Sequence, residues 1–264
     1  MEVDSYLNRL VGQLTIDKST RDAINASFDV LKAKIWSEYQ DRLRSVELFG
    51  SYLRATELPQ KVDIKSDVDI LVVFKSNDFK PTTMLNHLLE FADTEYSRSD
   101  VLKSHPTVVI EMKKVRFEIV PAYYESSFWN GEELKIPAPR NNDLKWITTE
   151  PQKLHKDLVA KNLQAHNLVI PVIKLIKYFN VRKGRPYESY LIEQHAIGID
   201  YEGQSIREFL MQFIDELDTS DANDLQREFI SELRVFRKNL YDLLKLKMYD
   251  YAKMEVEKYF PLLS

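Results

Sequence analysis

The chain has 264 residues, of which 44% are hydrophobic and 30% charged, and it contains six Gly and no Cys. This length suits one large domain or two closely packed ones. Without Cys, disulfide scaffolds, thiolate zinc sites and cysteine nucleophiles are excluded, and the six Gly are too widely spaced for a GxGxxG turn or a P-loop. The net charge of −4 does not favour a long polyanion as a substrate. With no signal-peptide pattern and no membrane-length apolar run, we expect a cytoplasmic protein that does not enter a membrane.

The first half of the chain indicates a mixed α/β arrangement. Apolar residues at three- and four-residue steps predict a helix over 19–43, with Ser19 and Asp22 as its N-terminal cap. A further helix is expected around 84–92, after Pro81. Short apolar runs predict four strands, at 46–49, 68–74, 107–112 and 115–120. The strand at 68–74 is apolar enough to be central and buried. The last two strands are expected to form a hairpin around Lys113-Lys114.

Helical periods dominate the second half, from Pro151 to the end. The segment 168–180 is apolar almost all round, which predicts a buried helix, and a long amphipathic pattern covers 224–259. We therefore expect a catalytic domain over 1–140, with the helix at 19–43 bridging to a helical domain over 141–264. A cleft between two such domains is a common place for a ligand.

Three carboxylates stand out in the first half. Asp67 and Asp69 open a strong strand, and because side chains alternate along a strand, both face the same way at roughly 7 Å spacing. Glu118 lies on another predicted strand, on the face that it shares with Arg116. Hard oxygen ligands on adjacent strands suit Mg²⁺ or Mn²⁺. In the plainer interpretation, Asp67 caps a strand, Asp69 is solvated and Glu118 pairs with Arg116.

The residues before this strand add to the pattern. Gly50 and Ser51 follow a short apolar strand, and Gly lets a backbone approach a phosphate closely while Ser adds a hydroxyl. With Arg54 and Thr56 they form GS-x-x-R-x-T, followed by the D-x-D strand and a third acid. This set resembles the polymerase-β-like nucleotidyltransferases, and especially their CD-NTase branch, the cyclic-oligonucleotide synthases similar to cyclic GMP-AMP synthase and oligoadenylate synthase.

The resemblance extends into the helical half, over about residues 45–195. It includes the motifs W-x-x-T-x-P, a lysine-bearing buried helix and a Ser-Tyr helix start, matched by WITTEP (146–151), PVIKLIKYFN (171–180) and ESYLIE (188–193). The resemblance implies that Lys177 and Ser189 hold the triphosphate of an incoming nucleotide and that Tyr190 stacks on a base. A lysine on an apolar helix snorkels or meets an anion, and Lys174, one turn earlier, is the other candidate for the phosphate contact.

The resemblance also implies a fold and a mechanism. The fold class is α+β: a nucleotidyltransferase core with a mixed sheet flanked by helices, packed against a C-terminal helical bundle, with the active site in the cleft between. Asp67, Asp69 and Glu118 are expected to be catalytic and to bind two Mg²⁺ ions, with Mn²⁺ as a substitute. Gly50 and Ser51 are expected to cradle the nucleotide phosphates. The third acid is Glu rather than the more usual Asp, and without Cys the zinc element of the vertebrate DNA sensor is not expected.

The implied reaction is the joining of NTPs, ATP among them, into cyclic or short linear oligonucleotide second messengers, in bacterial antiphage defence. A separately encoded regulatory protein or effector would be a partner. A long nucleic acid is not expected as a substrate or as an activator that acts through a zinc element, and other activation by nucleic acid stays open. A second hypothesis is transfer of a nucleotide to an RNA, a protein or a small acceptor. A third is an inactive nucleotide-binding module, whose mark would be the loss of an acid; all three acids are present.

Overall fold

The computed structural model describes residues 2–76, 79–97, 99–104, 106–112, 115–127, 131–138 and 145–263. Contacts within the chain divide it into two units, each described here by itself. The sheet unit comprises Asp17–Ala55 and Ser66–His155, and the helical unit comprises Met1–Ile16, Thr56–Lys65 and Lys156–Ser264. No helix among the described residues is both long and apolar enough to cross a membrane.

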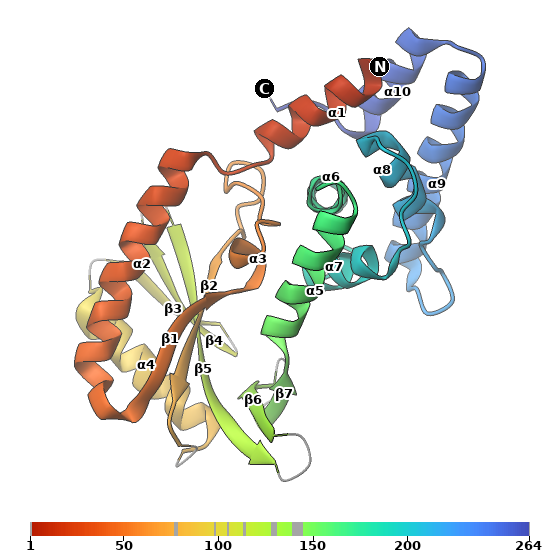
Figure 1. Ribbon diagram of the computed structural model, residues 1–264. Helices are drawn as coiled ribbons and strands as arrows, with labels where there is room; N and C mark the ends of the chain where they lie inside the picture. The colour runs from red at the N-terminus through yellow and green to blue at the C-terminus, as the bar shows by residue number, and fades with distance from the viewer. Residues whose placement is uncertain are drawn as a thin grey trace. The chain divides into compact units, whose positions relative to one another are not determined.

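The sheet unit carries all the strands of the described residues and the helices packed on them (Figure 1). Its elements in chain order are α2 (Lys18–Tyr39), a 3₁₀ turn (Gln40–Arg42), β1 (Leu43–Phe49), α3 (Gly50–Leu53), β2 (Val68–Phe74), α4 (Pro81–Glu95), β3 (Asp100–Ser104), β4 (Thr107–Met112), β5 (Val115–Ser127), β6 (Gly131–Pro137) and β7 (Trp146–Thr149).

These strands form one mixed sheet in the order β1-β2-β5-β4-β3, with β6 added to β5 and β7 added to β6. Strand β2 pairs antiparallel with β1 and parallel with β5, so it is central. Every residue from Ile70 to Phe74 is buried, as its apolar run predicts. The helices α2 and α4 contact each other and pack on the strands, covering one face of the sheet.

Two boundaries in this unit differ from the sequence prediction. The cap of α2 is Asp17 rather than Ser19 with Asp22: its carboxylate accepts a hydrogen bond from the backbone N–H of Thr20 at 2.9 Å, and the Ser19 hydroxyl also donates to it. The helix stops at Tyr39 because Gln40 adopts a φ of 43°. Residue 43, which we assigned to the helix, instead begins β1.

Strand β3, which pairs antiparallel with β4, is not predicted from the sequence, and neither are β6 and β7. Strands β6 and β7 are short and partly exposed, and they form an antiparallel extension of the long strand β5. In the predicted hairpin, Met112 on β4 lies opposite Val115 on β5, and the turn itself, Lys113-Lys114, lies outside the described residues. The sequence did not reveal this extension because its strands are short and partly exposed and therefore lack the apolar run of a buried strand, although β6 pairs with the strand just before it.

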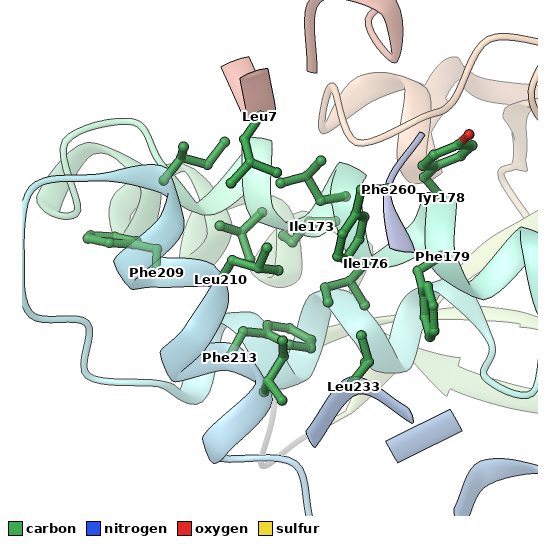
Figure 2. Close-up of a cluster of buried hydrophobic side chains, with 14 of the residues drawn as sticks. Leu7, Ile173, Ile176, Tyr178, Phe179, Phe209, Leu210, Phe213, Leu233 and Phe260 are labelled. Atoms are coloured by element: carbon green, nitrogen blue, oxygen red, sulfur yellow. The ribbon is translucent and has the colours of Figure 1, made fainter. Parts of the chain in front are cut away.

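The helical unit consists of α1 (Glu2–Gln13), most of α5 (Pro151–Gln164), α6 (Val169–Arg182), α7 (Ser189–Gly198), α8 (Ile206–Asp215), α9 (Asp224–Lys245) and α10 (Tyr249–Tyr259). Helix α6 is buried along most of its length, which confirms the predicted buried helix. The side chains that surround it come from α1, α8, α9 and the segment after α10, and Figure 2 labels Leu7, Ile173, Ile176, Tyr178, Phe179, Phe209, Leu210, Phe213, Leu233 and Phe260.

The long amphipathic pattern at 224–259 proved to be two helices. Helix α9 ends at Lys245, the backbone turns at Lys247 with a φ of 58°, and α10 begins at Tyr249. The two helices contact each other, so a continuous apolar pattern is explained by two antiparallel faces that meet the same core. The spacing of apolar residues predicts which residues are buried. It does not reveal a turn after which the same spacing continues.

The division by contacts also differs from the expected boundary between residues 140 and 141. Helix α1 packs on α10, α8 and α6, so the chain begins in the helical unit. The segment Thr56–Lys65 belongs to that unit as well, and β7 stays with the sheet because it pairs with β6. The chain therefore crosses between the units four times, after Ile16, Ala55, Lys65 and His155.

Candidate active site

Asp69 and Glu118 face each other across neighbouring strands of the sheet unit. Strands β2 and β5 run parallel, and the register places Asp69 opposite Glu118. Both side chains are half-buried, on the face opposite to that of the buried Phe117 and Ile119. Since paired residues on adjacent strands lie within contact distance, the two carboxylates share one patch of the sheet.

Asp67 joins this patch from the turn before β2. Burial, the nearby carboxylates of Asp69 and Glu118 and a hydrogen bond to Glu118 together raise the pKa of Asp67 to about 9, with burial the largest cause, while Arg116 opposes the shift. The proton that Asp67 retains at neutral pH relieves part of the repulsion among three acids. We call Asp67, Asp69 and Glu118 the acidic cluster.

Glu118 is held by neutral and cationic donors on the same sheet. The Arg116 guanidinium donates to Glu118 Oε1 at 3.3 Å, and the Thr107 hydroxyl donates to Oε2 at 3.4 Å. Arg116 also pairs with Glu111 at 2.6 Å, so its charge is divided between two carboxylates. The pairing of Glu118 with Arg116 in the plainer interpretation is therefore present, but the cluster as a whole remains rich in carboxylates.

Gly50 lies against the acidic cluster where β1 ends. Phe49 pairs with Asp69 in the β1–β2 register, so the next residue is beside the Asp69 side chain. Gly50 has a φ of 70°, and a Cβ built on it would lie 1.8 Å from Asp69 Oδ2. No residue with a side chain fits there without moving the carboxylate. Ser51 follows as a half-buried residue in α3.

The donor set of the acidic cluster fits Mg²⁺ or Mn²⁺. Carboxylate oxygens are their preferred protein ligands, and a cation would offset the repulsion that raises the pKa of Asp67. Among the described residues, no group of three or more Asp, Glu, His or Cys stands in an arrangement ready to hold a metal ion. The hydrogen bonds of Glu118 to Arg116, Thr107 and Asp67 would have to rearrange for the three acids to ligate together.

The other predicted site residues belong to the helical unit. Lys177 on α6 is buried and forms an ion pair with the buried Glu193 on α7, at 2.6 Å between Nζ and Oε1. Lys177 also donates to the Thr56 backbone oxygen at 3.2 Å and to its hydroxyl at 3.1 Å. The Thr56 hydroxyl in turn donates to Glu193. We call Lys177, Glu193 and Thr56 the lysine cluster.

The remaining candidates differ in exposure. Ser189 begins α7, as predicted, and is exposed, and Tyr190 has 49% of its surface exposed. Lys174 is buried and donates to the hydroxyl of Thr15 at 3.0 Å. Glu193 is not predicted as a site residue from the sequence. A signal was available, because Glu193 directly follows the apolar Leu191 and Ile192, and an acid on the buried side of a helix needs a partner.

The family follows from the sequence itself. Residues 1–162 match the model of the Second Messenger Oligonucleotide or Dinucleotide Synthetase (SMODS) domain. The match covers more than half of the chain, and the chain belongs to this family. No curated protein matches it.

Several solved structures share the fold. The CD-NTase CdnG of Bradyrhizobium diazoefficiens, solved with GTP, has a TM-score of 0.73 at 13% identity, with 97% of each chain covered. The Vibrio cholerae cyclic AMP-GMP synthase DncV, solved with a linear intermediate, has a TM-score of 0.71 at 11% identity, with 98% of this chain and 95% of that one covered. CdnC of E. coli MS115-1, in a CdnC:HORMA-deltaN complex, has a TM-score of 0.70 at 16% identity and covers 98% and 96%. These likenesses confirm the α+β fold of the CD-NTase branch.

Proposed function

We propose that this protein is a Mg²⁺-dependent nucleotidyltransferase that joins NTPs into cyclic or short linear oligonucleotides. The observation that carries the proposal is the parallel register of β2 and β5, which sets Asp69 opposite Glu118 with Asp67 and Gly50 beside them. The SMODS match supports the reaction class. Relatives of the same fold were solved with GTP and with a linear dinucleotide intermediate, which supports nucleotides as substrates and products.

In the proposed mechanism, Asp67 and Asp69 would hold two divalent cations, with Glu118 as a further ligand. When bound, the ions supply activation of the attacking hydroxyl and neutralisation of the leaving pyrophosphate. Glu118 accepts the proton of the ribose hydroxyl as that oxygen attacks the α-phosphorus and pyrophosphate leaves. Gly50 and Ser51 hold the nucleotide phosphates, where the missing Cβ of Gly50 leaves the backbone open to close approach. Positioning and charge neutralisation supply most of the rate.

The helical unit would bind the distal part of the nucleotide. Lys177 and Ser189 hold the terminal phosphates, and the exposed ring of Tyr190 stacks on a base. We further propose that the product is a second messenger in bacterial antiphage signalling. A separately encoded regulatory protein is proposed as a partner, since CdnC was solved in a complex with HORMA-deltaN.

The test is mass spectrometry of products made by the full chain from all four NTPs with Mg²⁺, with Mn²⁺ and with EDTA. We expect phosphatase-resistant small oligonucleotides with either cation and none with EDTA. Asp69→Asn and Glu118→Gln should abolish them while the protein remains folded. The matched control is Glu125→Gln on β5, which removes an exposed carboxylate that pairs with Lys135 at 3.1 Å and should leave activity intact.

The same assay separates the alternatives. If nucleotide from the NTPs is incorporated only when an RNA, a protein or a small acceptor is added, the reaction is transfer to that acceptor and not oligonucleotide synthesis. NTP binding that is unaffected by EDTA, with no pyrophosphate released, would indicate an inactive nucleotide-binding module. Product formation by Asp69→Asn would exclude the acidic cluster as the catalytic centre.

A further inference from the structure

We infer that Glu193 and Thr56 are positioning residues that hold the Lys177 ammonium for contact with the nucleotide triphosphate. The inference rests on the proposed function. It adds two residues to the proposed site and selects between the two lysines, Lys177 and Lys174, that the sequence leaves open.

Neighbouring buried groups hold the Lys177 ammonium in place. Only 5% of the Lys177 side chain and none of Glu193 is exposed, with the ammonium 2.6 Å from the carboxylate. An ammonium is a donor only, and that of Lys177 donates to Glu193, to the Thr56 carbonyl and to the Thr56 hydroxyl. The contact to the Thr56 carbonyl, at 3.2 Å, is the longest, and a phosphate oxygen would replace it first, while the Thr56 hydroxyl at 3.1 Å and Glu193 continue to hold the ammonium.

The carboxylate has a function that a neutral partner could not perform. A lysine buried without a counter-ion loses its charge or destabilises the fold, and an uncharged amine is a poor phosphate ligand. Glu193 keeps the ammonium charged in the absence of a nucleotide. Protein kinases use the same device, because there a lysine that contacts nucleotide phosphates is held by a glutamate.

The ion pair also brings Lys177 to the helix that carries the other proposed phosphate ligand. Glu193 is four residues after Ser189 on α7, so the two side chains lie on the same face of the helix, one turn apart. Ser189 is exposed at the first position of α7, whereas Glu193 is buried beneath it. The pair Lys177–Glu193 therefore sets α6 and α7 in the register that a joint contact to one triphosphate requires.

Lys174 provides the comparison within the same helix. It is also buried on α6, but the hydrogen bond that its ammonium makes at 3.0 Å goes to the hydroxyl of Thr15, a neutral and exposed residue. Thr56 and Thr15 thus each present a threonine hydroxyl to one of two lysines that lie one turn apart on α6. Thr56→Val and Thr15→Val remove the same group and differ in which lysine they affect.

The experiment measures affinities for AMP, ADP and an ATP analogue with a methylene group between the α- and β-phosphorus atoms, which cannot react at the α-phosphate. The full chain, Thr56→Val, Glu193→Gln, Lys177→Met and Thr15→Val are compared with Mg²⁺ present, and thermal unfolding verifies that each is folded. We expect the wild type to prefer the analogue over AMP. That preference should fall about tenfold in Thr56→Val and further in Glu193→Gln and Lys177→Met, as expected for losing a contact to a charged group.

Thr15→Val should retain the wild-type preference, and AMP affinity should change little in any variant. A structural role alone lowers the unfolding temperature without changing the preference for three phosphates over one. The inference is overturned if Lys177→Met loses the preference while Thr56→Val and Glu193→Gln keep it, or if Thr15→Val loses it instead. If Glu193→Gln does not fold, Thr56→Val decides. A wild type that binds none of the nucleotides refutes the proposed function itself, which separates the two failures.

Discussion

The acidic cluster of the sheet unit and the lysine cluster of the helical unit differ in how their positive and negative charges balance. In the acidic cluster three carboxylates face each other, and Arg116, shared with Glu111, offsets only part of their charge. In the lysine cluster one ammonium meets one carboxylate, and the Thr56 hydroxyl bonds to both. In these contacts the carboxyl groups outnumber the cation of the first cluster, whereas the second pairs one cation with one carboxylate.

This difference distinguishes the cluster that is proposed to bind metal cations from the cluster that is proposed to hold Lys177 in position for phosphate. Excess like charge is unfavourable in the folded protein unless a ligand offsets it, so its presence points to a ligand from outside. In the lysine cluster, the carboxylate and the hydroxyl hold the Lys177 ammonium in one arrangement, which prepares it for the proposed contact with the triphosphate. The predictions below either break one of the two clusters or test how they differ.

The largest expected effect follows from breaking the lysine cluster. Glu193→Ala leaves a buried ammonium without its carboxylate, and removing one partner of a buried pair costs about 3–5 kcal/mol. The measurement is the free energy of unfolding from urea titration. Asp200→Ala is the control, because Asp200 pairs with Lys161 while fully exposed, and it should cost far less. A loss in Glu193→Ala no larger than in Asp200→Ala would show that the pair is not buried in solution.

Gly50→Ala is expected to have the next largest effect, this time beside the acidic cluster. The new methyl group would meet Asp69 Oδ2 at 1.8 Å, and a φ of 70° is unfavourable for alanine. Such strain costs about 2 kcal/mol, and displacing Asp69 should abolish the proposed activity. Gly12→Ala is the matched control: no atom lies within 4 Å of its added Cβ, and an alanine in α1 should stabilise by about 0.5 kcal/mol. Full activity in Gly50→Ala would contradict the placement of Gly50 against Asp69.

The two clusters also differ in how far the sequence revealed them. Strand alternation placed Asp67 and Asp69 on one side of β2, and the apolar run identified β2 as central, so the acidic cluster could be anticipated from local patterns. That Glu118 is opposite Asp69 required the resemblance, because strand order is not a local property. Glu193 was missed for the same reason: its partner is set by which helices pack together.

Local patterns failed where the chain turned without changing its pattern. The apolar spacing of 224–259 continues through the turn at Lys247, and the helical periodicity of α2 continues into residues that begin β1. The N-terminal helix α1 packs on α6, α8 and α10, which are distant from it in sequence. In each case the missing information was a contact between segments, which composition and periodicity do not contain.

A smaller effect is expected from relieving the acidic cluster. Asp67→Asn removes a carboxyl group whose pKa burial and two neighbouring acids raise, while its amide can still donate to Glu118. We expect the variant to gain on the order of 1 kcal/mol in stability at neutral pH in EDTA, because the folded wild type must keep a proton on Asp67 that the unfolded chain releases, whereas the amide carries no such cost. Adding Mg²⁺ should raise the unfolding temperature of the wild type and leave that of Asp67→Asn nearly unchanged. An equal response to Mg²⁺ in both proteins would place the ion elsewhere.

The smallest expected effect concerns a third kind of buried group, a neutral histidine in the helical unit. Burial lowers the pKa of His195, opposed by its contact with the Phe213 carbonyl oxygen at 3.4 Å and by the charge of Glu216. Its ring also meets the Phe213 ring edge-on at 4.7 Å between centroids. The lowered pKa means that the unfolded chain binds the proton more readily than the folded one. Stability is therefore full above the ordinary histidine pKa of about 6.5 and falls as the pH drops through it.

His195→Gln should remove this pH dependence while keeping a polar side chain of similar length. The measurement is the difference in free energy of unfolding between pH 7.5 and pH 5.5, for the wild type and for the variant. We expect the wild type to lose more stability than His195→Gln on acidification, by a fraction of a kcal/mol. His166→Gln is the control, because His166 lies in the exposed turn between α5 and α6 and should retain the wild-type response. An identical pH response in the wild type and His195→Gln would mean that water reaches the His195 ring in solution, and burial would then no longer explain its lowered pKa.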